Sequence, residues 1–258
     1  KTLVAAGLVR LARKRDLHAL AVKPVETGCP FRDGMLYPED GTLLQEASEG
    51  DLTLDECAPF RFSLPASPAR AAATEGQYLN LHDIVEHVLA LGDRADFLVV
   101  EGAGGLMSPL GEDEYVADLA YDLGFPLVVV ARNTLGTINH VLQTLIAAST
   151  FRDGLEVAGI VLNQSTPPGD DPSTASNARE IRRHAVPPLV ADYLVYVVVL
   201  NLFVQFVPQA ITESFSVSLL TAALLLLVLH VVALVKTPLK ARFKAASAGA
   251  GKVLVGVT

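Results

Sequence analysis

Several continuous apolar runs predict strands that are buried on both faces of a sheet. They cover residues 18–22, 97–101, 126–131 and 157–163. Because successive side chains of a strand point to opposite faces, runs without polar alternation are typical of a parallel sheet covered on both sides. Helical patterns alternate with them, at residues 2–15, 81–91, 116–123 and 137–148. The alternation predicts an α/β fold with a parallel sheet and right-handed crossovers.

Two further stretches lack a clear period. Residues 30–73 are rich in Pro, Gly and acidic side chains, and we interpret them as a long functional insertion rather than a linker. Residues 167–176 have the composition of a loop, and residues 178–184 are expected to form a short helix after it. The sequence contains no internal repeat. The core is therefore expected to come from the alternating strands and helices.

The pattern changes after Pro187 and Pro188. Residues 215–235 contain no Asp, Glu, Lys or Arg, and roughly 20 apolar residues are enough to span a bilayer core. Residues 193–207 form a shorter apolar run. Because basic residues flank the outer ends of both runs, the pattern predicts a C-terminal apolar α-helical hairpin that crosses a membrane through 193–235, with both ends in the cytoplasm. The alternative is that both runs are core helices of a soluble protein.

Charge separates the same two parts of the chain. Residues 1–190 carry a net charge of −11 from 15 Lys/Arg and 26 Asp/Glu, whereas residues 191–258 carry +3 from 5 and 2. We therefore predict two domains, 1–190 and 191–258. The acidic balance of the first argues against nucleic-acid binding, which requires a basic surface. The two cysteines, Cys29 and Cys57, are too few for a disulfide framework and lack metal-ligand spacing, which favours a reducing, cytoplasmic setting.

Candidate phosphate and metal ligands stand at the ends of these elements. A phosphate site beside a parallel strand uses the amides of a helix N-terminus, a lysine for the phosphates and a hydroxyl for magnesium, which Lys1 and Thr2 would supply. Glu101 ends a buried strand, where a carboxylate is costly to bury without a cation. We expect Glu101 to bind magnesium, with a structural ion pair as the alternative. Asp40 is a weaker candidate because other acidic side chains lie close to it in sequence.

Further candidates would face the substrate. Lys23 follows the strand at 18–22 and brings an ammonium group to the sheet edge where parallel sheets bind ligands; the alternative is a surface lysine. Thr27, followed by Gly28, would add a hydroxyl and close backbone approach. Gly136 and Thr137 open a helix whose free amides are suited to a substrate carboxylate. Simple N-capping by Thr137 is a compatible alternative.

Taken together, these motifs resemble the dethiobiotin synthase family over residues 1–190. In chain order they are Lys1-Thr2, Lys23-Pro-Val-Glu-Thr-Gly28, Ser67-Pro68, Val100-Glu-Gly-Ala-Gly-Gly105, Leu135-Gly-Thr-Ile-Asn-His140, and Asn163 with Thr166-Pro-Pro-Gly169. Their order and spacing are specific to that family. A related ATPase with the same sheet architecture, such as a partitioning or cobyrinate-amidating enzyme, is an alternative that the second and last motifs argue against.

The resemblance implies a P-loop NTPase-type parallel sheet with helices on both faces. It also implies a homodimeric ligase that uses ATP and magnesium to close the ureido ring of dethiobiotin from 7,8-diaminononanoate and carbon dioxide, through a carbamate and a mixed carbamic-phosphoric anhydride. The implied site residues are Lys1 for the phosphates; Thr2, Asp40 and Glu101 for magnesium; Lys23 and Thr27 for the carbamate and the transferring phosphoryl group; Asn163 for adenine; and Gly136 and Thr137 for the substrate carboxylate.

Two departures from the family pattern lead to further expectations. The first strand and the glycines of the phosphate loop do not precede Lys1, so ATP binding is expected to be weak. The apolar run 252–258 has the composition of a strand and is a candidate substitute for the missing one. Residues 191–258 resemble no part of the family, and we favour a join of two sequences over a natural membrane-tethered fusion. The alternative function is a non-enzymatic two-helix membrane protein, or anchor, fused to a vestigial NTPase domain.

Overall fold

The computed structural model describes residues 1–164, 171–185 and 252–257. Its larger elements are helices α1 (Thr2–Arg13), α2 (Glu39–Ala47), α5 (Leu81–Gly92), α6 (Val116–Leu123), α7 (Thr137–Thr150) and α8 (Thr174–His184), with strands β1 (Ala19–Val22), β6 (Phe97–Glu101), β7 (Leu127–Arg132), β8 (Val157–Asn163) and β9 (Lys252–Val257). The chain divides into two compact units, residues 1–182 with 248–258, and residues 183–247. Every element named here except the end of α8 belongs to the first unit.

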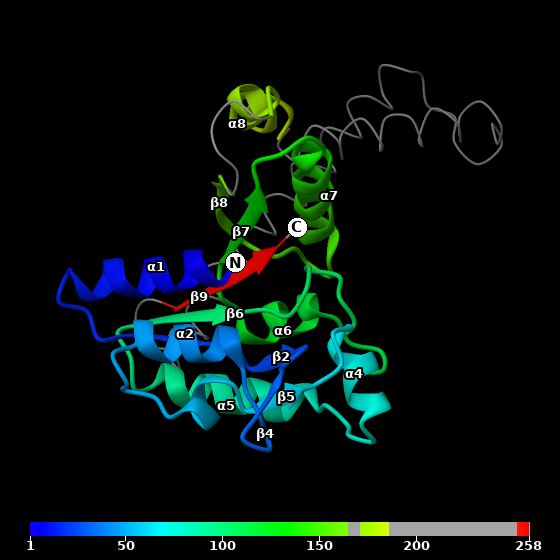
Figure 1. The fold of residues 1–258 in the computed structure, drawn as a ribbon. Helices are drawn as coiled ribbons and strands as arrows, with labels where there is room; N and C mark the ends of the chain where they lie inside the picture. The colour runs from blue at the N-terminus through cyan, green and yellow to red at the C-terminus, as the bar shows by residue number, and fades with distance from the viewer. Residues whose placement is uncertain (165–170, 186–251, 258) are drawn as a thin grey trace, which may run out of the picture. The chain divides into compact units, whose positions relative to one another are not determined.

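A five-stranded parallel sheet forms the centre of the first unit, in the order β1-β6-β9-β7-β8 (Figure 1). All four residues of β1 and the last four of β6 are buried. Since successive residues face opposite sides, this pattern means that both faces of these strands are covered. The predicted α/β fold with a parallel sheet is confirmed, and the four apolar runs that were expected to be strands are β1, β6, β7 and β8. The expected burial on both faces was wrong for β8, whose residues are half-buried or exposed because it is an edge strand.

The central position of the sheet is taken by the C-terminal strand β9. Its backbone pairs in parallel with β6, from Leu98 opposite Lys252 to Glu101 opposite Val255. On its other side it pairs in parallel with β7, from Leu127 opposite Leu254 to Val130 opposite Val257. The expectation that the run 252–258 forms a strand is therefore confirmed for residues 252–257. This strand fills the position between β6 and β7 that would otherwise be a gap in the sheet.

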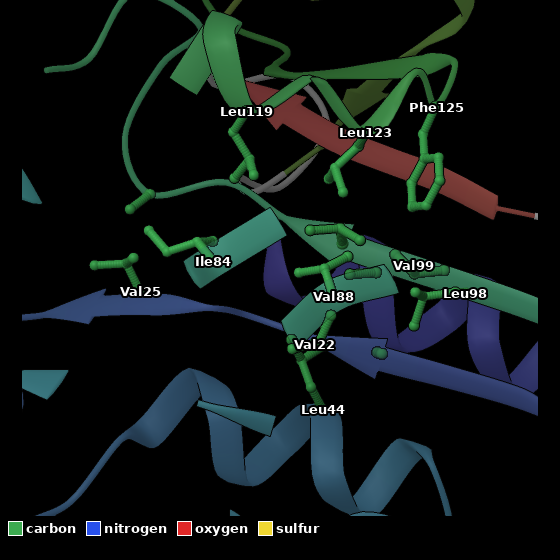
Figure 2. Packing of buried hydrophobic residues seen from close by; sticks show 14 of the residues in the cluster. Val22, Val25, Leu44, Ile84, Val88, Leu98, Val99, Leu119, Leu123 and Phe125 are labelled. Atoms are coloured by element: carbon green, nitrogen blue, oxygen red, sulfur yellow. The ribbon is translucent and has the colours of Figure 1, made fainter. Parts of the chain in front are cut away.

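Two groups of helices pack on this sheet. Helices α1 and α2 contact each other and β1, whereas α5 and α6 contact each other and α5 also contacts β6. Figure 2 shows how side chains from separate elements meet in one core, among them Val22 of β1, Val99 of β6, Leu44 of α2, Val88 of α5 and Leu123 of α6. Burial of such apolar side chains is the main source of folding free energy.

The segment 30–73, which has no clear sequence period, folds into short elements. These are β3 (Phe31–Arg32), β4 (Met35–Leu36), α2, α3 (Leu54–Cys57), β5 (Phe60–Phe62) and α4 (Pro68–Thr74). Strand β5 pairs in parallel with β2 (Val25–Thr27), and β3 pairs with β4 as a small antiparallel hairpin. The absence of a period in 30–73 therefore hid real secondary structure, and the interpretation of the segment as a functional insertion stays a prediction. Strands of two or three residues are too short to produce a readable alternation.

The described residues do not test the predicted membrane hairpin. Among the described residues, no helix combines the length and the apolar character that are needed to cross a bilayer. The predicted hairpin through 193–235 lies outside the described residues, as do residues 167–170 of the loop predicted at 167–176. Residues 171–173 are non-helical, as expected, whereas 174–176 already belong to α8, so the loop prediction was wrong there. The short helix expected at 178–184 is confirmed, and it begins earlier, at Thr174.

Candidate active site

The candidate residues gather where the parallel strands end. Glu101 is the last residue of β6, Lys23 directly follows β1, and Lys1 and Thr2 open α1. Asp40 lies in the first turn of α2, which packs against both α1 and β1. Because all these strands run parallel, their carboxyl ends meet at one edge of the sheet, where ligands of such folds bind. The topology thus brings together residues that are 100 positions apart in sequence.

Lys1 and Thr2 are both held against the end of β6. The Lys1 ammonium group donates hydrogen bonds to the carbonyl oxygens of Gly102 at 3.0 Å and Gly104 at 3.2 Å. Gly104 has a positive φ of 77°, and a Cβ at this position would collide with Ser108. A glycine is therefore required for the turn that presents these carbonyl groups. An ammonium group has three N–H donors, so one remains for a ligand.

The Glu101 carboxylate is the centre of a small charged cluster. Its Oε1 accepts a hydrogen bond from the Thr2 hydroxyl at 3.0 Å and lies 3.4 Å from the Lys23 ammonium group. Lys23 is also paired with Asp40 through a short contact. Glu101 is 0% exposed, and its second oxygen, Oε2, has no hydrogen-bond partner among the described residues. A buried carboxylate oxygen without a hydrogen-bond donor or a cation is unfavourable, so Oε2 is a candidate ligand for a metal ion.

Burial and charge act in opposite directions on these groups. For Lys23, burial lowers the pKa, but the carboxylates of Glu101 and Asp40 outweigh it, so the pKa is raised above its ordinary value. For Asp40, burial raises the pKa, and the Lys23 ammonium group outweighs it and holds the pKa below its usual range. Burial lowers the pKa of Lys1, against the attraction of Glu101. Lys23 and Asp40 are therefore a charged pair at neutral pH.

The donor set of this cluster fits magnesium. Mg²⁺ is bound by oxygen ligands, commonly one or two carboxylates completed by water and substrate phosphate. The Thr2 hydroxyl and the carboxylates of Asp40 and Glu101 are such ligands, and the unpartnered Oε2 of Glu101 is an open coordination position. No group of three or more His, Cys, Asp or Glu side chains suited to a metal occurs in the described part of the chain. A magnesium ion here would therefore need phosphate oxygens to complete its shell.

The remaining predicted residues lie outside this cluster. Thr27 ends β2 in the smaller sheet, and no contact joins it to Lys23 or Glu101 in the described structure. Asn163 ends β8, and its carbonyl oxygen accepts a hydrogen bond from the amide of Asn133 at 2.9 Å. Both residues still lie at the ends of parallel strands, so their expected roles for phosphate and adenine stay predictions.

Gly136 and Thr137 open helix α7, as the sequence predicted, but Thr137 does not cap it. The N-cap of α7 is Gly136, with a φ of 91°, and no side chain caps the helix. The alternative that Thr137 is the N-cap was therefore wrong, because the helix begins at Thr137 itself. The Thr137 amide donates to the Thr134 carbonyl oxygen at 3.2 Å. A substrate carboxylate would have to share that amide or use the one of Gly136.

Glu26 is a functional candidate that the sequence reasoning missed. It lies in β2 and is 4% exposed, and its carboxylate accepts hydrogen bonds from the amides of Asp40 and Gly41. One sequence signal could have identified it. The helix at residues 39–47 follows Pro38, which has no side-chain acceptor for the first amides, so the acceptor had to come from elsewhere.

A parallel sheet with a Lys-Thr helix start, a buried glutamate at a strand end and a lysine at the same edge defines an ATP-binding α/β enzyme of the P-loop NTPase type. A family model described as an AAA domain matches residues 1–221. The chain belongs to the family of ATP-dependent dethiobiotin synthetases, as its similarity to curated members shows.

Three relatives illustrate this similarity, and all three are named ATP-dependent dethiobiotin synthetase. The protein of Anaeromyxobacter dehalogenans is 47% identical over 183 residues, which cover 71% of this chain and 79% of the relative. The protein of Bacillus licheniformis is 40% identical over 191 residues, with 74% and 78% covered. The protein of Thermodesulfovibrio yellowstonii is 36% identical over 189 residues, with 70% and 78% covered.

The comparisons decide between the ATPase families that share this sheet. They favour the dethiobiotin synthetases over the partitioning and cobyrinate-amidating enzymes, in agreement with the motifs at 23–28 and 166–169. The match to the AAA domain extends to residue 221, past the domain boundary predicted at residue 190.

Proposed function

We propose that this chain is an ATP- and magnesium-dependent ligase that forms dethiobiotin from 7,8-diaminononanoate and carbon dioxide. The observation that carries the proposal is the Glu101 carboxylate, which is fully buried at the carboxyl edge of the sheet with one oxygen unpartnered. A carboxylate that is buried only for stability would have both oxygens satisfied. Family membership supplies the substrates, because the similar relatives are named dethiobiotin synthetases.

The charges of the cluster explain the need for a metal. Lys1 and Lys23 contribute two positive charges, and Asp40 and Glu101 contribute two negative charges, so the cluster is neutral overall. A polyphosphate would gain little net attraction from such a site. Magnesium, when bound with ATP, would neutralise phosphate charge as it develops. Thr2, Asp40 and Glu101 are the side chains that would hold it.

The residues of the chain then have separate tasks. Lys1, with one N–H left free, would hold a phosphate oxygen at the start of α1. Lys23 would leave its pairing with Asp40 and attract the carbamate and the transferring phosphoryl group, together with Thr27. Asn163 would contact the adenine, and the amides of Gly136 and Thr137 would bind the substrate carboxylate.

We further propose a homodimer that works in the cytoplasm, as the family resemblance implies. Residues 193–235 stay a predicted membrane hairpin. The competing function is a membrane anchor with a vestigial NTPase domain, and the two functions differ in what they require of Glu101. An anchor has no use for a buried carboxylate with an open oxygen, whereas the ligase depends on it.

The experiment is calorimetric titration of MgATP into the full chain and into its Glu101→Ala variant, purified in detergent. Saturable binding that requires magnesium and is lost in Glu101→Ala supports the ligase. A wild-type chain that binds no MgATP, although its circular dichroism and thermal unfolding show a folded protein, would favour the anchor. Addition of diaminononanoate and bicarbonate to the bound chain should then yield ADP and dethiobiotin.

A further inference from the structure

Glu26 is a buried carboxylate between two candidate catalytic residues. It lies in β2, three residues after Lys23 and directly before Thr27, and it is 4% exposed. Its Oε1 accepts the amide hydrogen bond of Asp40 at 3.0 Å, and its Oε2 accepts that of Gly41 at 2.8 Å. Both oxygens are thus satisfied by the backbone of another element. None of the roles assigned above to ATP, magnesium or substrate uses this side chain.

The two amides belong to the first turn of α2. The first amides of a helix have no intrahelical acceptor and normally receive one from the side chain of the N-cap residue. The N-cap of α2 is Pro38, and no side chain of its own segment caps the helix. Glu26 replaces this cap from 14 and 15 residues away, and its negative charge also favours a helix N-terminus. The start of α2 is therefore fastened to β2.

This attachment fixes the position of Asp40. The amide that Glu26 Oε1 holds is the amide of Asp40 itself, and the Asp40 carboxylate pairs with Lys23 on the other side. Lys23 and Glu26 leave the same stretch of chain, immediately after β1. Asp40 is consequently held at its backbone by Glu26 and at its carboxylate by Lys23. When Lys23 turns to a substrate, the backbone contact with Glu26 and the side-chain hydrogen bond with Thr2 still hold Asp40.

We propose that Glu26 is a positioning residue that holds Asp40 at the magnesium site by capping α2 from a neighbouring strand. This inference rests on the proposed function, because it assigns a task to Asp40 as a magnesium ligand. Glu26 does not touch magnesium or substrate. It acts through the backbone of α2, as partners of metal ligands commonly do, and loss of such a partner typically weakens metal binding by about 10- to 100-fold.

The test compares three variants of the full chain. Glu26→Ala removes both acceptors. Glu26→Gln keeps the shape and one acceptor, but turns an N–H donor toward the other amide. Asn80→Ala is the matched control, because Asn80 caps α5 by accepting the His82 amide hydrogen bond at 2.9 Å and has no contact with the site. For each protein we would measure the magnesium concentration that gives half-maximal ATP binding, the thermal midpoint, and hydrogen exchange at the amides of residues 39–41.

The expected result is that Glu26→Ala raises the half-maximal magnesium concentration about tenfold, with Glu26→Gln in between and Asn80→Ala unchanged. ATP affinity at saturating magnesium should change less. Exchange at Asp40 and Gly41 should become faster in the Glu26 variants only. If Glu26→Ala lowers the thermal midpoint as Asn80→Ala does and leaves the magnesium midpoint unchanged, Glu26 is only a helix cap and the proposal is wrong. If Glu26→Ala does not fold, Glu26→Gln decides by the same criteria.

Failure of the proposed function gives a different pattern. In that case wild type would bind no ATP at any magnesium concentration, and the exchange rates alone would still test the contact. Unchanged protection of Asp40 and Gly41 in Glu26→Gln and Glu26→Ala would then contradict the proposal, whereas lost protection would support the capping of α2 by Glu26.

Discussion

Replacing Glu101 with glutamine should separate the stability of this protein from its nucleotide binding. The substitution keeps the shape of the side chain and the oxygen that accepts the Thr2 hydroxyl at 3.0 Å. It removes the negative charge and turns the unpartnered Oε2 into an amide group. If Glu101 mainly stabilises the fold, the substitution should lower the unfolding free energy. If Glu101 mainly binds magnesium, the substitution should lower the MgATP affinity instead.

Two large effects on the free energy of unfolding oppose each other in the ligand-free protein. The lost attraction between the carboxylate and the Lys23 ammonium group, at 3.4 Å, is about 5 kcal/mol at an effective dielectric constant of about 20. The relieved cost of burying that charge, with one oxygen unpartnered, is also several kcal/mol. Lys23 keeps Asp40 as a partner. We therefore expect a net change below about 2 kcal/mol.

Magnesium-dependent ATP binding has no such compensation, because an amide oxygen is a poorer magnesium ligand than a carboxylate. We expect a loss of about 100-fold or more, or about 2.7 kcal/mol. The assays are urea unfolding without ligand and calorimetric titration of MgATP. If the unfolding free energy falls by more than about 4 kcal/mol and the MgATP affinity is unchanged, Glu101 is a structural ion-pair residue and not a magnesium ligand.

Three further predictions concern the stability of the protein. Lys23→Ala removes the cation that pairs with Asp40 and Glu101, so the unfolding free energy should fall by about 3–5 kcal/mol. Added magnesium should stabilise this variant more than it stabilises wild type. Equal stabilisation of both proteins by magnesium would contradict this prediction. Hydrogen bonds from the backbone of Thr53 and from Arg94 lower the pKa of Glu56 to about 2. The stability that Glu56 contributes is therefore fully present above its ordinary pKa of 4.5 and should disappear as the pH falls toward about 2. Glu56→Gln should flatten the dependence of unfolding free energy on pH in this range, and an unchanged dependence would rule out the contribution. Removal of residues 252–258 takes the central strand from between β6 and β7 and should abolish cooperative thermal unfolding; an unaltered thermal transition would show that the strand is not needed.

The sequence predicted the large elements well for a physical reason. Strand Phe97–Glu101 is apolar up to its last residue because both of its faces are covered, and helix Val116–Leu123 has a clear apolar stripe. Strand Val157–Asn163 has the same apolar run although it lies at the edge of the sheet and is only partly buried. The segment 30–73 gave no such signal. Its strands are two or three residues long, and α2 begins after a proline without a local cap.

The site was predictable in composition and less so in geometry. Glu101 and Lys23 could be placed at one sheet edge because strand direction fixes where strand ends meet. The pairing of Lys23 with Asp40 depends on how α2 packs against β1, which no local pattern encodes. The role of Glu26 depends on a contact across 14 residues, and it was hidden for the same reason. The hydrogen bonds that the Lys1 ammonium group donates to two carbonyl oxygens likewise could not be predicted from the sequence.

Product formation by the full chain tests most directly whether the protein is a dethiobiotin-forming ligase. Purified protein would be incubated with 7,8-diaminononanoate, ¹³C-bicarbonate and MgATP, and dethiobiotin would be measured by mass spectrometry with ADP release as the second readout. We expect labelled dethiobiotin and an equal amount of ADP, both lost in Glu101→Gln. A folded chain that binds MgATP and releases no labelled dethiobiotin would contradict this expectation.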